Sequence, residues 1–288
     1  MSQSDVSAVE PVDHESWSDA QEAVELRVDG HDLTVAYRDE GPADGRPLIF
    51  LHGIPTWSYL WRRVAPAFEA DRRVIVPDML GYGNSQGGDG FDRSIRAQEH
   101  MLQALIDELE LGVVDLVAHD IGGGVALRYT AHHPDRVEDL VLSNAVCYDS
   151  WPVEFVSDLG LPETARKAPE DIEPTLDFAF ADGLVTDDPD PAFVAGMKAP
   201  WLREDGPLNL ARAAVSTNTN HTTEIPYEHI DSRVLCLWGE DDVMQPLEYG
   251  ERLAEDLGGT VETVSPAFHW VVEDQPDAYV EELASFLV

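Results

Sequence analysis

Short runs of mostly apolar residues recur along the chain, and stretches with helical periodicity separate them. The runs lie at 47–53, 72–81, 113–119, 139–145, 233–242 and 260–267, and a pair with in-out alternation, 24–30 and 31–41, flanks Gly30. Apolar residues recur at helical spacing in 57–69, 92–110, 122–133, 246–257 and 274–287. Apolar strands that alternate with helices are typical of a mainly parallel sheet covered by helices on both faces. The sequence therefore predicts an α/β fold with eight strands, in which the hairpin around Gly30 forms an antiparallel edge.

Residues 147–227 interrupt this alternation. They are rich in Pro and Asp, carry short helical patches, and are followed by another apolar strand. We therefore predict that this segment leaves the sheet as a helical cap, and that 23–146 and 228–288 form the core. Residues 1–22 are polar and acidic without periodicity, and they are expected to form a loose N-terminal arm.

The charge balance is strongly acidic. The 288 residues include 56 Asp and Glu but only 18 Lys and Arg, for a formal net charge of −38. The acids are spread along the chain, so they predict an acidic surface instead of a disordered acidic tail. Such a surface repels itself in dilute buffer and is screened at molar salt, where the Debye length is about 3 Å. The composition resembles that of proteins from organisms that keep high salt inside the cell, and it argues against nucleic acid and anionic membranes as partners.

The sequence carries no signal for a membrane or for a cofactor. Its apolar runs are shorter than the roughly 18 residues of a membrane span, and its first residues lack the basic and apolar regions of a signal peptide. We therefore expect a cytoplasmic protein. It contains neither a phosphate-binding glycine loop nor a His and Cys cluster with metal-ligand spacing, so no metal and no other cofactor are expected.

Three residues with catalytic potential each follow a different predicted strand: Asp120, Asp242 and His269. In open α/β sheets, reactive groups gather at the carboxyl ends of the strands. The chain order of nucleophile, acid and histidine is that of the α/β-hydrolase triad. Asp120 has an alternative interpretation as a simple helix N-cap. The ordered arrival of the acid and the histidine favours a nucleophile on a strand-to-helix turn, where Gly122 and Gly123 allow close packing.

Five motifs in this order resemble the aspartate-nucleophile branch of the α/β-hydrolase superfamily, which contains haloalkane dehalogenases and epoxide hydrolases. They are LHGIPTWSYLWR (51–62), PDMLGYGNS (77–85), HDIGG (119–123), WGEDDVMQP (238–246) and FHW (268–270). The similarity covers nearly all of 24–288 outside the cap, and the stretch PTWSYLWR looks more like the dehalogenases. The resemblance implies an α/β-hydrolase fold, with a mainly parallel eight-stranded sheet and an inserted helical cap.

A carboxylate at the turn has a chemical reason. A serine that attacks a saturated carbon would form an ether, which the enzyme could not hydrolyse, whereas a carboxylate forms an ester that water can open. Asp120 is ionised at neutral pH and needs no base for the first step. In the second step His269 would activate water, and Asp242 would orient the imidazole. The resemblance implies that the backbone N–H groups of Ile54 and Ile121 receive the oxyanion.

The side chains that would hold a leaving group depart from the family pattern. Dehalogenases of this fold commonly hold the halide with the Trp after the nucleophile and with an Asn on the HGxP loop or a cap Trp, and here Ile121 and Ile54 stand at the first two places. Substitute donors would have to come from Trp57, Trp151, Trp201 or His221. Epoxide hydrolases usually polarise the ring oxygen with two cap tyrosines, for which Tyr148 and Tyr227 are the candidates. Packing explains the tryptophans equally well, and a hinge role explains the tyrosines.

The function expected from these residues is hydrolysis of the carbon–halogen bond of a small haloalkane-like substrate through an Asp120 ester. Epoxide opening by the same mechanism is the alternative. A non-catalytic ligand-binding protein of this fold is a third candidate, against which the intact set of Asp120, Asp242 and His269 argues. The expected partners are a small apolar electrophile and water.

Overall fold

The computed structural model describes residues 6–216 and 218–287 and contains one eight-stranded sheet. The strands are β1 (Glu22–Val28), β2 (His31–Glu40), β3 (Pro47–Leu51), β4 (Arg73–Pro77), β5 (Val114–His119), β6 (Val137–Ser143), β7 (Arg233–Gly239) and β8 (Thr260–Val264). Their order across the sheet is β1-β2-β4-β3-β5-β6-β7-β8. β2 pairs antiparallel with β1 and β4, and the remaining neighbours pair parallel. The predicted α/β fold with its antiparallel edge is confirmed.

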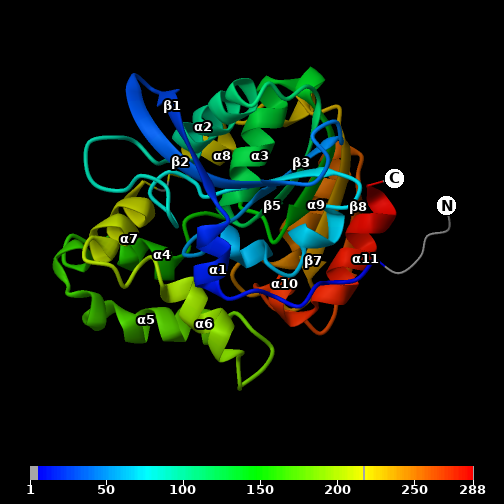
Figure 1. The fold of residues 1–288 in the computed structure, drawn as a ribbon. Helices are drawn as coiled ribbons and strands as arrows, with labels where there is room; N and C mark the ends of the chain where they lie inside the picture. The colour runs from blue at the N-terminus through cyan, green and yellow to red at the C-terminus, as the bar shows by residue number, and fades with distance from the viewer. Residues whose placement is uncertain (1–5, 217, 288) are drawn as a thin grey trace.

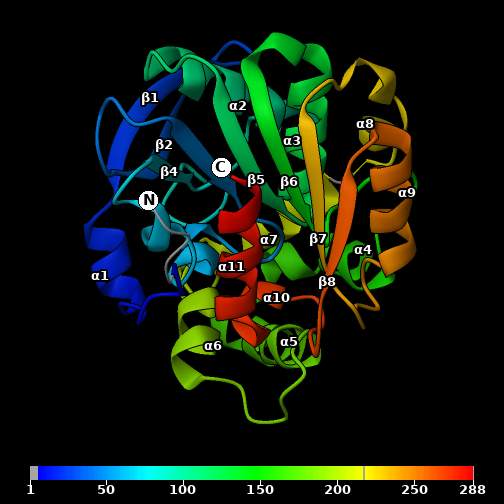
Figure 2. The same cartoon turned by 90° about the vertical axis from the view of Figure 1, so that its right-hand side faces the viewer.

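Helices cover both faces of this sheet, which is why its central strands lack an in-out alternation. Figure 2 shows α11 (Pro276–Phe286) in front of the strands and α2 (Ile95–Glu108) and α3 (Ile121–His132) behind them. A further helix, α9 (Leu247–Leu257), packs against β7. All six residues of β5 are buried as a result. The strand that leads to the candidate nucleophile is therefore held rigidly in the core.

Two predicted helices are broken by proline. The segment predicted as one helix over 57–69 forms two short 3₁₀ helices, η1 (Ser58–Trp61) and η2 (Ala65–Phe68), and Pro66 lies in the first turn of the second. The last predicted helix is split into α10 (Val271–Asp274) and α11, which begins at Pro276. Proline has no backbone N–H and clashes with the preceding turn, so a continuous helix through either position is unfavourable.

The N-terminal segment is more ordered than its polar sequence predicts. Residues His14–Asp19 form helix α1, and the side chain of Asp13 caps its start. Trp17 of this helix is fully buried, and its indole N–H donates to Ser58 Oγ at 2.9 Å. The expectation of a loose arm over 1–22 is therefore wrong for residues 13–19. One large aromatic residue anchors the segment, and a single buried position leaves no periodicity in the sequence.

The segment 147–227 forms helices α4 (Glu154–Leu159), α5 (Pro169–Asp182), α6 (Pro191–Lys198), α7 (Gly206–Val215) and α8 (Asn220–Thr223), with the 3₁₀ helix η4 (Thr164–Arg166) between α4 and α5. Figure 1 shows α4–α7 grouped below the sheet, whereas α8 lies beside α3. We call α4–α7 with the residues that lead into them, 147–215, the cap. None of the helices in the described part of the chain is long and apolar enough to cross a membrane.

Candidate active site

The turn between β5 and α3 holds Asp120 in a strained conformation. β5 ends at His119, α3 begins at Ile121, and the φ of Asp120 is 52°, in the left-handed region that residues with a side chain rarely adopt. Close packing explains the glycines that follow. A Cβ on Gly122 would lie 2.4 Å from the carbonyl oxygen of His52, and a Cβ on Gly123 would lie 2.3 Å from the Cβ of Ala145. Such contacts are shorter than real side chains tolerate, so only glycine permits this turn.

The Asp120 carboxylate does not cap its own helix. Its Oδ1 instead accepts a hydrogen bond from the backbone N–H of Ile54 at 2.8 Å, across the loop that follows β3. The carboxylate lies directly over Gly53, where a Cβ would come within 2.3 Å of Oδ1. The geometry therefore agrees with a nucleophile presented on a turn and disagrees with the N-cap interpretation.

Asp242 and His269 meet Asp120 in the folded chain. Asp242 follows β7 and His269 follows β8, and the His269 Nδ1 lies 2.8 Å from Asp242 Oδ2. The other ring nitrogen, Nε2, lies 3.9 Å from Asp120 Oδ2. All three side chains are buried. The structure thus brings together the three residues that the sequence placed at the ends of different strands.

Asn144 is a positioning residue that the sequence analysis did not identify. It follows β6, and its Nδ2 donates to Asp242 Oδ2 at 2.6 Å, while its Oδ1 accepts from the Gly239 N–H at 3.2 Å. The Met244 N–H donates to the other carboxylate oxygen of Asp242 at 2.7 Å. Asp242 is therefore held in one orientation toward the imidazole. The only signal in the sequence was the place of Asn144 at the carboxyl end of a predicted strand.

The three buried ionisable groups shift one another's pKa values. Burial raises the pKa of Asp120, although His269 and the N–H groups of Ile54 and Ile121 oppose that shift. Burial also opposes ionisation of Asp242, but His269 and Asn144 outweigh it and lower the pKa of Asp242. Burial disfavours the charged form of His269 too, yet Asp242 and Asp120 together raise its pKa. The imidazole therefore holds its proton more strongly while both carboxylates are charged.

A small, mostly apolar cavity of about 20 Å³, which we call the active-site cavity, lies over Asp120 and His269. Its other lining residues are Ile54, Pro55, Trp151, Val153, Phe155, Val156, Ala179, Met244, Gln245 and Trp270. Trp151 is 2% exposed, and its indole N–H has no hydrogen-bond partner among the described residues. The side-chain oxygen of Gln245, which is 1% exposed, also has none in the described part of the chain. Sequence analysis singled out Trp151 but not Gln245, which nothing distinguishes from a surface loop residue in the sequence.

The other two tryptophans predicted for the pocket hold the cap against the core instead. The Trp57 indole N–H donates to the carbonyl oxygen of Gly196 at 2.9 Å. The Trp201 indole N–H donates to the carbonyl oxygen of Pro55 at 2.6 Å. Both donors are therefore already engaged by backbone acceptors, and neither residue lines the active-site cavity. The packing interpretation applies to both.

Neither predicted tyrosine reaches the active-site cavity. The rings of Tyr148 and Tyr227 stack with their centroids 4.5 Å apart, and the Tyr148 hydroxyl donates to Asp256 at 2.7 Å. The Tyr227 hydroxyl accepts from the Tyr148 N–H and donates to the carbonyl oxygen of Thr222. The pair thus ties the two ends of the inserted segment together. His221 is also remote from the cavity, because it lies in α8, where its carbonyl oxygen accepts from Arg128.

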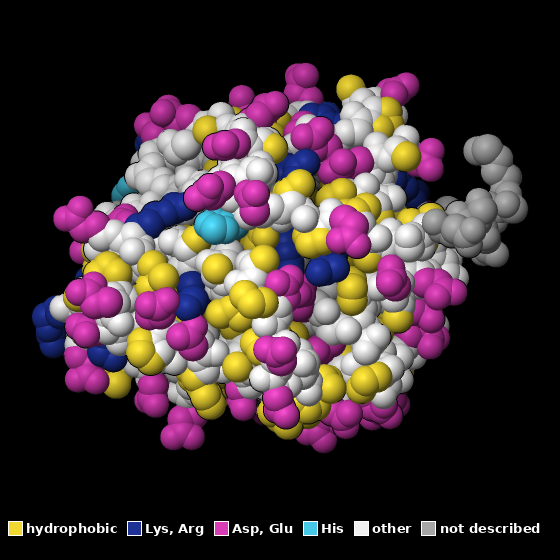
Figure 3. All heavy atoms as spheres, turned by 60° about the horizontal axis from the view of Figure 1, so that its bottom comes forward, with side chains coloured by type: hydrophobic (Ala, Val, Ile, Leu, Met, Phe, Trp, Pro, Cys, Tyr) yellow, Lys and Arg dark blue, Asp and Glu magenta, His cyan; other side chains and the backbone are white. Residues whose placement is uncertain are grey.

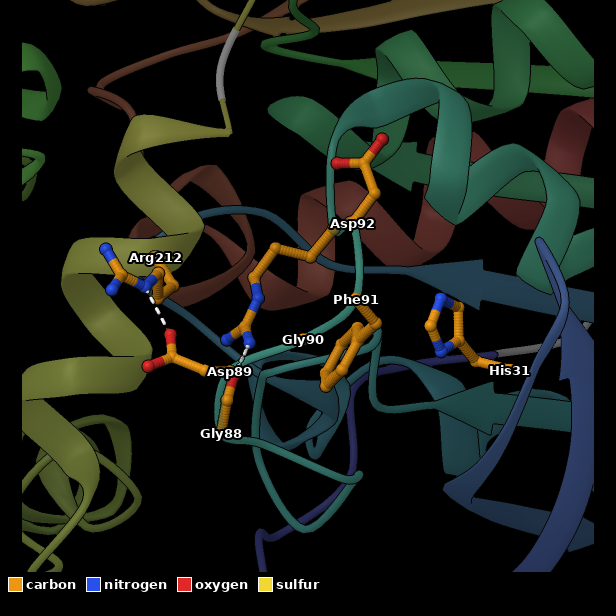
Figure 4. A pocket seen from close by; sticks show the side chains of 8 residues that line it. His31, Gly88, Asp89, Gly90, Phe91, Asp92 and Arg212 are labelled. Atoms are coloured by element: carbon orange, nitrogen blue, oxygen red, sulfur yellow. Dashed lines mark hydrogen bonds and ion pairs between the residues drawn. The ribbon is translucent and has the colours of Figure 1, made fainter.

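A second hollow opens on the surface between the loop 88–93 and α7 (Figure 4). It is lined by Arg93 and Arg212 together with His31, Phe91, Asp89, Asp92 and two glycines. Arg212 donates to Asp89 at 2.5 Å, and Arg93 donates to the Gly88 carbonyl oxygen. Its basic groups are thus paired within the hollow, and it shares no lining residue with the active-site cavity.

The chain is similar to known proteins in both sequence and structure. A family model described as "alpha/beta hydrolase fold" matches residues 46–276, a range that includes Asp120, Asp242 and His269. A haloalkane dehalogenase of Mycolicibacterium paratuberculosis is 40% identical over 124 residues, which are 40% of this chain and 39% of that protein. The chain thus spans well under half of that relative. A haloalkane dehalogenase of Psychrobacter cryohalolentis is 26% identical over 273 residues, covering 89% of this chain and 88% of that protein.

A solved structure matches nearly the whole chain. It is an alpha/beta hydrolase fold protein from Burkholderia ambifaria, which is 28% identical with a TM-score of 0.81. The match covers 91% of this chain and 98% of that one. The segment 147–227 is too long to lie outside the matched part, so the solved protein also carries a counterpart to much of it.

Proposed function

The chain belongs to the α/β-hydrolase fold family, and we propose that it is a hydrolase of the haloalkane dehalogenase type that acts through a covalent ester of Asp120. One observation carries the proposal. A carboxylate stands on the strained turn after β5, where it faces an imidazole 3.9 Å away that Asp242 orients. The names of the two dehalogenase relatives support the choice of a halide as leaving group.

The first step is displacement of the halide. Asp120 Oδ2 attacks the carbon that carries the halogen, so a carbon–oxygen bond forms while the carbon–halogen bond breaks and the halide leaves with the bonding electrons. The Ile54 N–H holds the other carboxylate oxygen and so orients the attack. The unpartnered indole N–H of Trp151 lines the same cavity and would donate to the departing halide. Trp151 thus takes the role for which Ile54 and Ile121 lack side-chain donors.

The second step is hydrolysis of the ester. His269 Nε2 accepts a proton from water, and the resulting hydroxide attacks the carbonyl carbon of the Asp120 ester. The oxyanion forms on Asp120, where the N–H groups of Ile54 and Ile121 stabilise it. Collapse breaks the bond between the carbonyl carbon and the alkoxide oxygen, and His269 returns its proton to the leaving alcohol. The regenerated acid loses a proton to solvent, so the products are an alcohol, a halide and a proton.

The timing of the two steps follows from the charges. Both Asp242 and Asp120 raise the pKa of His269 in the free enzyme, against the effect of burial. Esterification removes the charge of Asp120 and with it one of these two contributions. The pKa of His269 therefore falls once the ester has formed, which favours the neutral imidazole that the second step needs.

The proposal is tested by the intact mass of a His269→Phe variant after incubation with bromoalkanes and epoxides. Removal of the base should trap the ester, and a mass gain equal to the alkyl group without bromine is expected. The double variant Asp120→Ala with His269→Phe should gain no mass, which controls for modification elsewhere. A gain equal to a whole epoxide would favour the alternative chemistry, and the absence of any adduct would contradict the Asp120 ester.

Epoxide opening has weaker support in this site. It requires a donor that protonates or polarises the ring oxygen, and the two tyrosines considered for that role are bonded to Asp256 and to backbone groups instead. The unpartnered donor in the cavity is an indole, which has no acidic proton to give up but suits an anion. These contacts favour the halide over the epoxide.

We also propose that the surface is adapted to the cytoplasm of a cell with high internal salt. Figure 3 shows acidic side chains distributed over the face drawn, with few basic ones among them, in keeping with the net charge of −38. Screening of this repulsion should stabilise the fold. Thermal unfolding followed by circular dichroism should give a melting temperature that rises from dilute buffer to multimolar KCl. A melting temperature independent of salt would contradict this proposal.

A further inference from the structure

The active-site cavity holds a buried acceptor that neither proposed step uses. Gln245 follows Asp242 by three residues, and its side-chain oxygen has no partner within the described residues. The backbone at Gln245 is held in place by two features. The Gln245 carbonyl oxygen accepts from the Trp238 indole at 2.7 Å, and α9 begins two residues later. The amide is therefore held at the cavity lining, where it is 1% exposed.

An amide in this position affects which ligands can enter. A buried side-chain amide oxygen without a hydrogen-bond donor is unfavourable, so in the absence of a ligand a water molecule would pair with the side-chain oxygen of Gln245. A purely apolar ligand that displaces this water leaves the oxygen unpaired. A ligand with an O–H or N–H group restores the bond. The cavity thus discriminates between molecules of equal size by their hydrogen-bonding groups.

Trp151 does not remove this requirement. Its indole N–H is a donor, yet neither it nor the Gln245 oxygen has a partner, so the two are not bonded to each other. The remaining lining apart from Asp120 and His269 is apolar. The indole N–H of Trp151 and the side-chain oxygen of Gln245 therefore lie at separate places in the lining, and in the proposed reaction the indole N–H serves the halide.

We propose that Gln245 is a specificity-determining residue that accepts a hydrogen bond from an O–H or N–H group of the substrate. The preferred substrates are then small halogenated alcohols or amides, and halogenated hydrocarbons are poorer ones. This inference rests on the proposed function for the reacting end of the substrate. The binding of the polar end is separable from the chemistry and can be measured alone.

Three bromides with the same number of heavy atoms test this binding: 1-bromobutane, 1-bromo-2-methoxyethane and 3-bromopropan-1-ol. Their dissociation constants are measured by tryptophan fluorescence in an Asp120→Asn background, which keeps the shape of the site and forms no alkyl ester. Addition of Gln245→Leu should weaken the alcohol relative to 1-bromobutane by on the order of 10- to 100-fold. The ether accepts but cannot donate, so its affinity relative to 1-bromobutane should not fall. An unchanged alcohol-to-alkane ratio, or an equal effect on the ether, would overturn the inference.

Matched variants separate this effect from cavity shape. Met244→Leu changes a neighbouring lining residue without removing a hydrogen-bonding group, so it should shift the three ligands by similar factors. Gln245→Met, which keeps an unbranched side chain, should repeat the result of Gln245→Leu if the latter folds poorly. The melting temperatures of all variants are measured to show which of them fold properly.

Bromide release by the wild-type enzyme distinguishes failure of this inference from failure of the proposed function. A shifted binding ratio without bromide release supports Gln245 as the acceptor and contradicts dehalogenation. Bromide release with an unshifted binding ratio supports dehalogenation and contradicts the role of Gln245 as the acceptor. If Gln245→Leu, introduced into the enzyme with Asp120 and His269 intact, instead slows hydrolysis of the ester equally for all three bromides and the binding ratio is unchanged, Gln245 positions water, and the inference is wrong.

Discussion

The two sides of the active-site cavity are built differently. The core side consists of residues attached to strand ends, in which Asp120, Asp242 and His269 are linked to one another and to backbone N–H groups. The cap side consists of residues on loops and helices, where Trp151 presents an unpartnered donor while Trp201 uses its donor to fasten the cap. The hydrogen bonding of the sheet fixes the positions of residues at strand ends. The role of a cap tryptophan depends on whether a backbone carbonyl oxygen lies close enough to accept its indole N–H.

The largest expected effect is on the core side. Asp120→Ala removes the nucleophile, so turnover should fall by about 10⁴-fold or more, to the background of the assay. The side chain is not part of the helix cap, so folding should persist. Bromide release and the melting temperature are measured together. Appreciable turnover in a folded variant would mean that the core side does not carry the chemistry.

The next effect separates two tryptophans that look equivalent in the sequence. Trp151→Phe should lower kcat/KM for a bromoalkane by about 10- to 100-fold, because a donor to the leaving halide is lost. Trp57→Phe should leave kcat/KM nearly unchanged but lower the free energy of unfolding by about 1–3 kcal/mol, because the Gly196 carbonyl oxygen loses the indole donor. Steady-state kinetics and urea unfolding of both variants provide the comparison. Equal kinetic losses in the two variants would refute the distinction.

A smaller effect is the pH dependence of kcat, which should depend on the core side of the cavity and not on the cap side. Ester hydrolysis needs neutral His269, so kcat should fall about tenfold per pH unit below the pKa of His269 in the ester. Burial lowers that pKa and Asp242 raises it, and the raising effect of ionised Asp120 is present only in the free enzyme. The midpoint of the kcat profile should therefore lie below the midpoint of His269 titration in the free enzyme, measured by NMR. Trp151→Phe should keep the wild-type midpoint, and coincidence of the kinetic and NMR midpoints would count against this ordering.

The smallest expected effect tests the base of the cap. Tyr227→Phe leaves the Tyr148 N–H without its acceptor and should lower the free energy of unfolding by about 1–2 kcal/mol. Since Tyr227 does not line the active-site cavity, kcat/KM should change by less than about twofold. Chemical denaturation and kinetics on the same sample measure both quantities. A loss of activity without a loss of stability would indicate that Tyr227 contacts the substrate.

Much of the core could be predicted because its patterns are local. Apolar runs between helical segments indicated eight strands and their antiparallel edge, and the carboxyl ends of those strands indicated where Asp120, Asp242 and His269 would gather. Asn144 and Gln245 had no such pattern. Their importance comes from partners about a hundred residues away, as for Asn144 and Asp242, or from the absence of any partner among the described residues, as for Gln245.

The sequence by itself determined the fold and the chemical character of the nucleophile, since strand ends and a carboxylate on a glycine-rich turn depend on neighbouring residues. The tertiary structure decided which polar groups remain unpaired. Trp57, Trp151 and Trp201 carry the same indole, and only packing engages two of them with Gly196 and Pro55 and leaves the third facing the active-site cavity. Hydrogen-bond satisfaction is a property of long-range contacts, and in this protein it distinguishes residues that hold the cap from residues available to a substrate.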